Sequence, residues 1–168
     1  MLIGESFVGD GAAAAHVNTV VGRRDGPVGT AFATALATPS AGHAPFLAVV
    51  QPGVPAKPPT LFVNKAAIAG NEHADLTWGA AQAGVAAGVA DALANGTIAA
   101  PEADDLVVIA AVWVNPRATL ADAAAVYANN RAATAGALVA GRANLPLADD
   151  VIDAARHPHN PFFTPESP

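Results

Sequence analysis

Two short stretches near the start of the chain, residues 2–9 and 13–21, combine hydrophobic and polar positions on either side of a glycine-rich turn and predict strands. A period of two residues is typical of β-strands with one buried face, and Gly9-Asp10-Gly11 between the stretches suits a hairpin turn. The second stretch divides into two faces: Ala15, Val17, Thr19 and Val21 on one, and Ala14, His16, Asn18 and Val20 on the other. The pattern therefore predicts a hairpin with His16 and Asn18 on the same side.

The rest of the chain alternates between apolar stretches and helical ones. Short apolar stretches predict buried strands at 46–50, 60–68 and 106–114, and proline-rich residues 51–59 predict a stiff loop. Helices are predicted up to about Ala37 and over 71–94, 119–140 and 147–156. This order predicts an α+β fold, a single sheet with helices mainly on one face. Because no repeat or linker divides the chain, we expect one domain over residues 1–168.

The predicted helix over 71–94 carries an apolar stripe with one polar exception. At about 100° per residue, one narrow arc holds Trp78, Val85, Val89 and Leu93. Gln82 lies inside that arc, about 40° from Trp78. A buried amide without partners costs about 1–3 kcal/mol. Gln82 is therefore either bonded to the backbone or a ligand contact, and the pattern favours neither.

The composition indicates contacts between subunits. Charged residues make up 13% of the chain, about half the average for soluble domains. Much of the 52% hydrophobic content is alanine, so the core is either thin and closely packed or completed by a partner chain. A surface with so little charge is more often buried between subunits than exposed to water. We therefore expect a homo-oligomer.

Charge and residue content exclude several classes of function. The net charge of −6 and the absence of a basic run argue against nucleic acid or an anionic membrane as a partner. Without cysteine there is no disulfide, thiolate zinc site or thiol nucleophile. Apolar stretches end before the roughly 18 residues of a membrane span, and no signal-peptide pattern is present. We therefore expect a cytoplasmic protein without a metal, and His157-Pro158-His159 is more typical of a solvated tail than of a metal site.

Two side chains carry possible chemistry with an ordinary alternative. His16 is either a core histidine bonded to a neighbour or a general acid at the floor of a cleft, since its ordinary pKa of about 6.5 allows proton transfer near neutrality. Lys65 ends a predicted strand on the face of Leu61 and Val63. From this pattern alone we expect its ammonium to reach solvent.

Several short motifs occur in order along nearly the whole chain. They are Val8-Gly9-Asp10-Gly11 with Ala15-His16-Val17-Asn18, Phe46 to Val50 with Pro52, Pro55 and Lys57-Pro58, Thr60-Leu61 with Asn64-Lys65, Gly79 to Ala86, Glu102 to Leu106, and His157-Pro158. Any one of these motifs is weak. Together they resemble the formaldehyde-activating enzyme family.

The resemblance implies a fold, an assembly and a reaction. It implies a fold like the second domain of ribosomal protein S5 and a cytoplasmic homopentamer with active sites at subunit boundaries. The implied activity is that of a carbon–oxygen lyase, which joins formaldehyde to tetrahydromethanopterin to give methylene-tetrahydromethanopterin and water without a metal. By position, it implies that His16 is the proton donor and that the reduced pterin is contacted by Asn18, Leu47, Lys65, Ala67 and Gln82.

Two of these positions depart from the family's pattern. Asn18 stands where the family has aspartate, and Ala67 stands where it has threonine. Charge-assisted hydrogen bonds are roughly twice as strong as neutral ones, and either loss weakens binding by about 1–3 kcal/mol. The alternative is therefore a non-catalytic paralogue that binds or senses a reduced pterin or a formaldehyde adduct.

Overall fold

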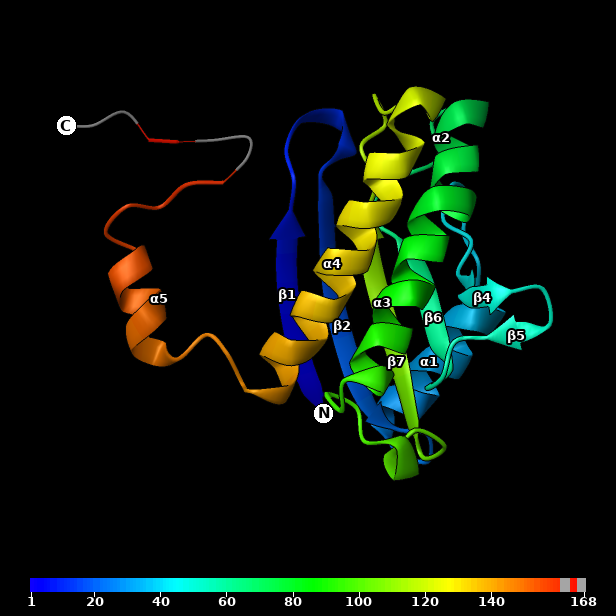
Figure 1. The fold of residues 1–168 in the computed structure, drawn as a ribbon, viewed down its shortest axis with the longest axis vertical. Helices are drawn as coiled ribbons and strands as arrows, with labels where there is room; N and C mark the ends of the chain where they lie inside the picture. The colour runs from blue at the N-terminus through cyan, green and yellow to red at the C-terminus, as the bar shows by residue number, and fades with distance from the viewer. Residues whose placement is uncertain (161–163, 166–168) are drawn as a thin grey trace.

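A five-stranded mixed sheet, in the order β1-β2-β7-β6-β3, forms the centre of the computed structural model, which describes residues 1–160 and 164–165 (Figure 1). Its strands are β1 (Leu2–Val8), β2 (Ala15–Arg23), β3 (Phe46–Leu47), β6 (Thr60–Asn64) and β7 (Leu106–Trp113). β6 and β7 are parallel, and the other neighbours are antiparallel. A parallel pair needs a crossover connection. Here the crossover contains α2 (Asn71–Asp75), a π-helical segment (Leu76–Ala81) and α3 (Gln82–Ala94).

The helices cover the two faces of the sheet unequally. α3 and α4 (Ala123–Arg142) lie side by side across one face, whereas α1 (Pro27–Ala37) packs against β2 and β7 from the other (Figure 1). α1 approaches the sheet at Gly22, where an added Cβ would lie 2.6 Å from Val28 Cγ2. The α+β class is therefore confirmed, with helices mainly on one face.

The remaining elements are short. They are β4 (Val49–Gln51) and β5 (Val54–Pro55), which form a separate two-stranded sheet, α5 (Ala148–Ala154), and 3-10 turns at Gly11–Ala13, Ala100–Glu102 and Leu120–Asp122. α5 stands apart from the sheet and its helices (Figure 1). In the described part of the chain, no helix combines the length and the apolar character needed to cross a membrane.

The predicted hairpin and most predicted elements are confirmed, but two strands differ. The predicted strand 46–50 divides at Ala48, whose N–H donates to Thr60 O and whose carbonyl accepts from Ala56 N–H, each at 2.9 Å. Residues before and after this point therefore join different sheets. The strand predicted to reach residue 68 ends at Asn64, because the Asn64 side chain bonds the carbonyls of Gly42 and Ala66 at 2.8 Å and turns the chain.

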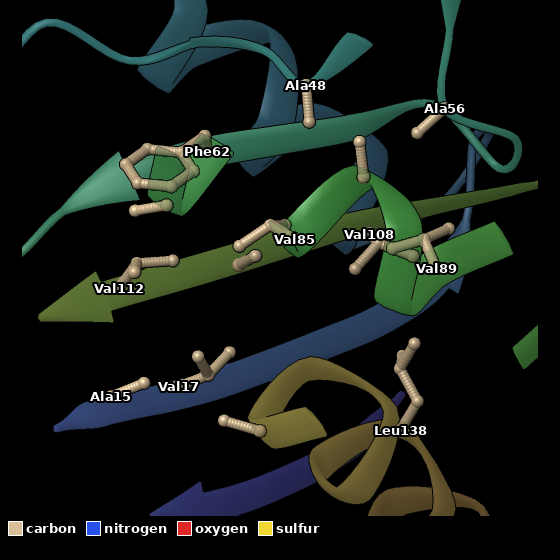
Figure 2. Close-up of a cluster of buried hydrophobic side chains, with 14 of the residues drawn as sticks. Ala15, Val17, Ala48, Ala56, Phe62, Val85, Val89, Val108, Val112 and Leu138 are labelled. Atoms are coloured by element: carbon tan, nitrogen blue, oxygen red, sulfur yellow. The ribbon is translucent and has the colours of Figure 1, made fainter. Parts of the chain in front are cut away.

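The hydrophobic core lies between the sheet and the α3–α4 layer, and its side chains are small. Figure 2 shows Val17, Val108 and Val112 from the sheet beneath Val85 and Val89 of α3. Glycines let the two helices and the sheet approach closely, since an added Cβ at Gly84 would lie 2.5 Å from Tyr127 O and one at Gly4 only 1.7 Å from Ala137 O. The alanine-rich core is thus closely packed, the first of the two expectations from composition.

The predicted apolar stripe of the long helix needs one correction. Val85 and Val89 are fully buried, but Trp78 is 48% exposed. Trp78 lies in the π-helical segment, where bonds from residue i to i+5 place an extra residue in the turn. The extra residue rotates the residues before Gln82 around the helix axis, relative to those after it. The regular spacing of 100° per residue therefore places Trp78 on the wrong face.

Candidate active site

α1 covers only part of the second face of the sheet. This face is open at the end where the hairpin turn joins β1 and β2. His16 and Asn18 of β2 point to this face, because Ala15, Val17 and Thr19 between and beside them are buried against the helices. The register of the hairpin pairs Glu5 with Asn18 and Phe7 with His16. Side chains from both strands of the hairpin therefore gather on one open surface.

His16 lies at the centre of a connected polar group. Its Nε2 is 2.9 Å from Glu5 Oε1, and its Nδ1 is 3.2 Å from Lys65 Nζ. The same Lys65 ammonium donates to Asn18 Oδ1 at 2.6 Å. Lys65 follows directly after β6, two strands away from β2, and reaches across β7. The chain of contacts thus runs Glu5–His16–Lys65–Asn18, and Lys65 makes these contacts while its side chain stays exposed, as the pattern predicted.

A comparison with two other histidines separates His16 from a structural role. His73 is 2% exposed, its Nδ1 accepts from Ala69 N–H at 3.0 Å, and its Nε2 donates to Val114 O at 3.1 Å. His43 Nδ1 contacts Asn64 O at 2.8 Å. Both of these rings fix the backbone, whereas both ring nitrogens of His16 contact titratable side chains. The core-histidine alternative therefore describes His73, not His16.

The surroundings of His16 and Lys65 favour the loss of protons. Partial burial, and then the charge of Lys65, holds the pKa of His16 below its ordinary value of 6.5, while Glu5 acts in the opposite direction. Burial also lowers the pKa of Lys65 from its ordinary value of 10.5, against the opposing charge of Glu5. In both side chains the neutral form is therefore favoured more than in free solution.

His16 opens into a cavity of about 1190 Å³. The cavity is lined by the polar groups Glu5, Asn115, Arg117 and His159 and by the aromatic rings of Phe7 and Trp113. The His16 side chain is 35% exposed. The imidazole therefore faces open space large enough for a ring-shaped substrate, as a general acid at the floor of a cleft requires.

A second, smaller hollow of about 420 Å³ contains two other predicted residues, Leu47 and Gln82, together with Trp78. Gln82 is 8% exposed, and its Oε1 accepts a hydrogen bond from Val49 N–H. The first alternative for Gln82 is therefore confirmed, since its oxygen is bonded to the backbone; because its side chain also lines the hollow, a ligand contact stays a prediction.

The six residues predicted for the site fall into three places within one chain. His16, Asn18 and Lys65 contact one another, and Leu47 and Gln82 share the smaller hollow. Ala67 is exposed beside Gly42, where an added Cβ would lie 3.1 Å from Ala67 Cβ. One chain alone thus brings His16, Asn18 and Lys65 together but does not gather all six predicted residues in one place.

Two participants in this site were missed from the sequence. Glu5 contacts His16, and the two-residue period of the predicted strand could have placed it on the same face as Phe7. His159 of the tail lines the large cavity, although it was expected to be merely solvated. Among residues 1–160 and 164–165, no group of three or more His, Asp or Glu side chains is arranged to hold a metal.

Fold and site together define an α+β protein with a histidine-centred cluster of polar side chains on an open sheet face. The chain belongs to the formaldehyde-activating enzyme (Fae) family, whose sequence profile matches residues 3–163.

Two of its relatives are bifunctional Fae/Hps enzymes. The protein from Methanococcoides burtonii is 42% identical over 160 residues, and the one from Archaeoglobus fulgidus is 41% identical over 160 residues. These matches cover 94% and 95% of this chain, but the chain spans only 40% of the length of either relative. A 5,6,7,8-tetrahydromethanopterin hydro-lyase from Methanosarcina barkeri is 38% identical over 160 residues, covering 94% of this chain and 89% of that protein.

Proposed function

We propose that the protein is a carbon–oxygen lyase that condenses formaldehyde with tetrahydromethanopterin, giving methylene-tetrahydromethanopterin and water. Family membership and the similarity to a tetrahydromethanopterin hydro-lyase over nearly its full length support the reaction. The single observation that carries the proposal is the position of His16, which faces a large cavity and contacts Glu5 and Lys65 through its two ring nitrogens.

The reaction needs an acid at one step and a base at another. One amine of the pterin adds to formaldehyde to form a carbinolamine, N–CH₂–OH. The carbon–oxygen bond breaks when the hydroxyl takes a proton and leaves as water, because hydroxide itself leaves poorly. The second amine then bonds to the same carbon and releases its proton. Proton donation and proton return balance, so one titratable group serves both steps, and we assign this role to His16.

The pterin contacts extend the site beyond the proton-transfer group. We assign Asn18 and Lys65, which contact each other, and Leu47 and Gln82, which share the smaller hollow, to binding of the reduced pterin. Ala67 completes this set by its position in the family pattern. The pterin is a co-substrate, and the proposed chemistry uses no metal.

We further propose that a homopentamer completes the site, with neighbouring copies joining the His16 group to the hollow of Leu47 and Gln82. The low charge content supports the assembly, as do exposed apolar side chains on these surfaces, among them Ile3, Leu47 and Trp78. The fold of ribosomal protein S5 domain 2, a single domain over residues 1–168 and a cytoplasmic location remain part of this proposal.

A second candidate is a non-catalytic paralogue that binds or senses a reduced pterin or a formaldehyde adduct. The observation that favours it is the Lys65–Asn18 contact, in which a neutral amide stands where the family pattern has a carboxylate. An amide compensates the ammonium less than a carboxylate and binds it less strongly. Tight binding of the pterin without faster condensation would support this candidate.

The test of the proposed reaction compares wild type with His16→Gln. We expect the wild type to accelerate loss of formaldehyde when tetrahydromethanopterin is present, and we expect His16→Gln to lower kcat by roughly 10²- to 10⁴-fold, the usual contribution of a general acid. His157→Gln, at an exposed position outside the cavity lining, is the matched control and should keep full activity. Equal turnover in wild type and His16→Gln would exclude His16 as the acid.

A further inference from the structure

Glu5 contributes a carboxylate to the site from the edge strand of the sheet, opposite Asn18 in the hairpin. Building on the proposed function, we propose that Glu5 is a positioning residue for the proton transfer. It holds Nε2 of His16 as the N–H, so that Nδ1, beside Lys65, is the nitrogen that gives and takes the reaction's proton.

The hydrogen-bonding capacities of Glu5, His16 and Lys65 allow one arrangement of hydrogens before substrate binds. An ionised carboxylate can only accept a hydrogen bond, so the 2.9 Å contact requires a hydrogen on Nε2. A lysine ammonium can only donate, so the 3.2 Å contact requires Nδ1 to accept. His16 is therefore neutral with its hydrogen on Nε2, and one hydrogen occupies the gap between Nδ1 and Nζ.

This arrangement sets where the transferable proton is held. Because only one hydrogen fits between Nδ1 and Nζ, His16 and Lys65 together carry one positive charge, and Glu5 balances it. During dehydration the proton passes from this pair to the carbinolamine hydroxyl, which leaves as water. During ring closure the second amine returns a proton to the pair. Nε2 stays bonded to Glu5 throughout, so the ring does not change its orientation between the two steps.

Glu5 is suited to orientation rather than to stability. Its side chain is 58% exposed, and ion pairs at such positions contribute little to folding. Phe7, paired with His16 across the hairpin, lies with its ring centre 5.9 Å from the imidazole and flanks the ring. Other titratable groups that line the cavity with His16 are Asp10, Arg117 and His159. Among the groups facing His16, Glu5 is the carboxylate in direct contact.

The substitution Glu5→Gln tests this role without a change in side-chain size. Its amide can accept through oxygen or donate through nitrogen, so residue 5 no longer fixes the hydrogen on Nε2 and the Lys65 ammonium alone disfavours the other tautomer. The tautomer with hydrogen on Nδ1 would direct that hydrogen at the Lys65 ammonium. A wrong tautomer in an acid–base histidine has a large effect on turnover, and we expect kcat to fall at least roughly tenfold while binding of the pterin alone changes by less than about twofold.

Three readouts separate positioning from a structural effect. First, the ¹⁵N resonances of His16 should report the Nε2–H tautomer in wild type and a mixture in Glu5→Gln. Second, the limb of the pH–rate profile where activity falls with rising pH should move to lower pH, because Glu5 raises the pKa of His16. Third, Glu5→Asp, which keeps the charge, should restore most of kcat. Glu72→Gln, an exposed carboxylate of α2, is the control and should match wild type.

The outcomes distinguish this inference from the proposed function. A wild type that binds the pterin but does not accelerate condensation overturns the proposed function, and the role of Glu5 in turnover with it. A wild type that turns over, together with a Glu5→Gln variant that keeps kcat, the pH limb and the Nε2–H tautomer, overturns the role of Glu5 alone. Thermal unfolding of each variant shows that a loss of activity does not come from a loss of folding.

Discussion

At the residue scale, the sequence predicted which side chains of β2 face the site but not what they contact. Alternation alone placed His16 and Asn18 together, and the structure keeps this pattern. The contact between His16 and Glu5 depends on the hairpin register, which the 3-10 turn at Gly11–Ala13 helps to set. The reach of Lys65 depends on strand order, since Ala111 of β7 lies between Asn18 and Val63 and places only a methyl group in the way.

The charge on Lys65 has a measurable effect on its neighbour. Burial and the positive charge of Lys65 both lower the pKa of His16, so Lys65→Met should raise this pKa relative to wild type. Histidine NMR titration measures this pKa directly in both proteins. An unchanged or lower pKa in Lys65→Met would contradict the arrangement in which the ammonium contacts Nδ1. His73→Gln, which removes a ring bonded to the backbone, serves to assign the resonances.

At the element scale, periodicity predicted the order of strands and helices well because each element buries one face. It failed where a single hydrogen bond or turn decided the outcome. The division at Ala48 depends on bonds to Thr60 and Ala56, residues that are distant or lie beyond a proline-rich loop. Trp78 is exposed because it lies in a π-helical segment. A prediction based on 100° per residue does not allow for the extra residue of such a segment.

The close packing of α3 against α4 predicts opposite effects for two glycine substitutions. In a helix, alanine is normally favoured over glycine by about 1 kcal/mol. An added Cβ at Gly88 would lie 2.6 Å from Arg131 O, a backbone atom that cannot move alone, so Gly88→Ala should lower the free energy of unfolding by about 1–3 kcal/mol. An added Cβ at Gly79 meets nothing within 4 Å, so Gly79→Ala should be neutral or stabilising. Urea unfolding measures both, and a stable Gly88→Ala would show that the helices can separate.

At the scale of the whole molecule, the division of the site within one chain is the strongest argument for assembly. His16 and Glu5 line the large cavity, whereas Leu47 and Gln82 line a different hollow. The composition predicted an oligomer because the chain has fewer charged residues than a surface fully exposed to water usually carries. Composition could not predict whether copies share a site, since that depends on which surfaces meet.

Subunit mixing tests whether neighbouring copies share the site. His16→Gln and Gln82→Ala should each lower turnover when assayed alone. Suppose that each site combines His16 of one copy with Gln82 of its neighbour. In rings assembled at random from equal amounts of the two variants, some sites are then intact. These are the sites where a Gln82→Ala copy supplies His16 and the adjacent His16→Gln copy supplies Gln82. Head-to-tail contacts in a ring make this about a quarter of all sites. Activity near a quarter of wild type after co-refolding is therefore expected, with separately refolded variants, mixed afterwards without exchange, as the control. If each site instead lies within one copy, no mixed ring contains an intact site. Mixed rings would then be no more active than the separate variants, and this result would contradict a shared site.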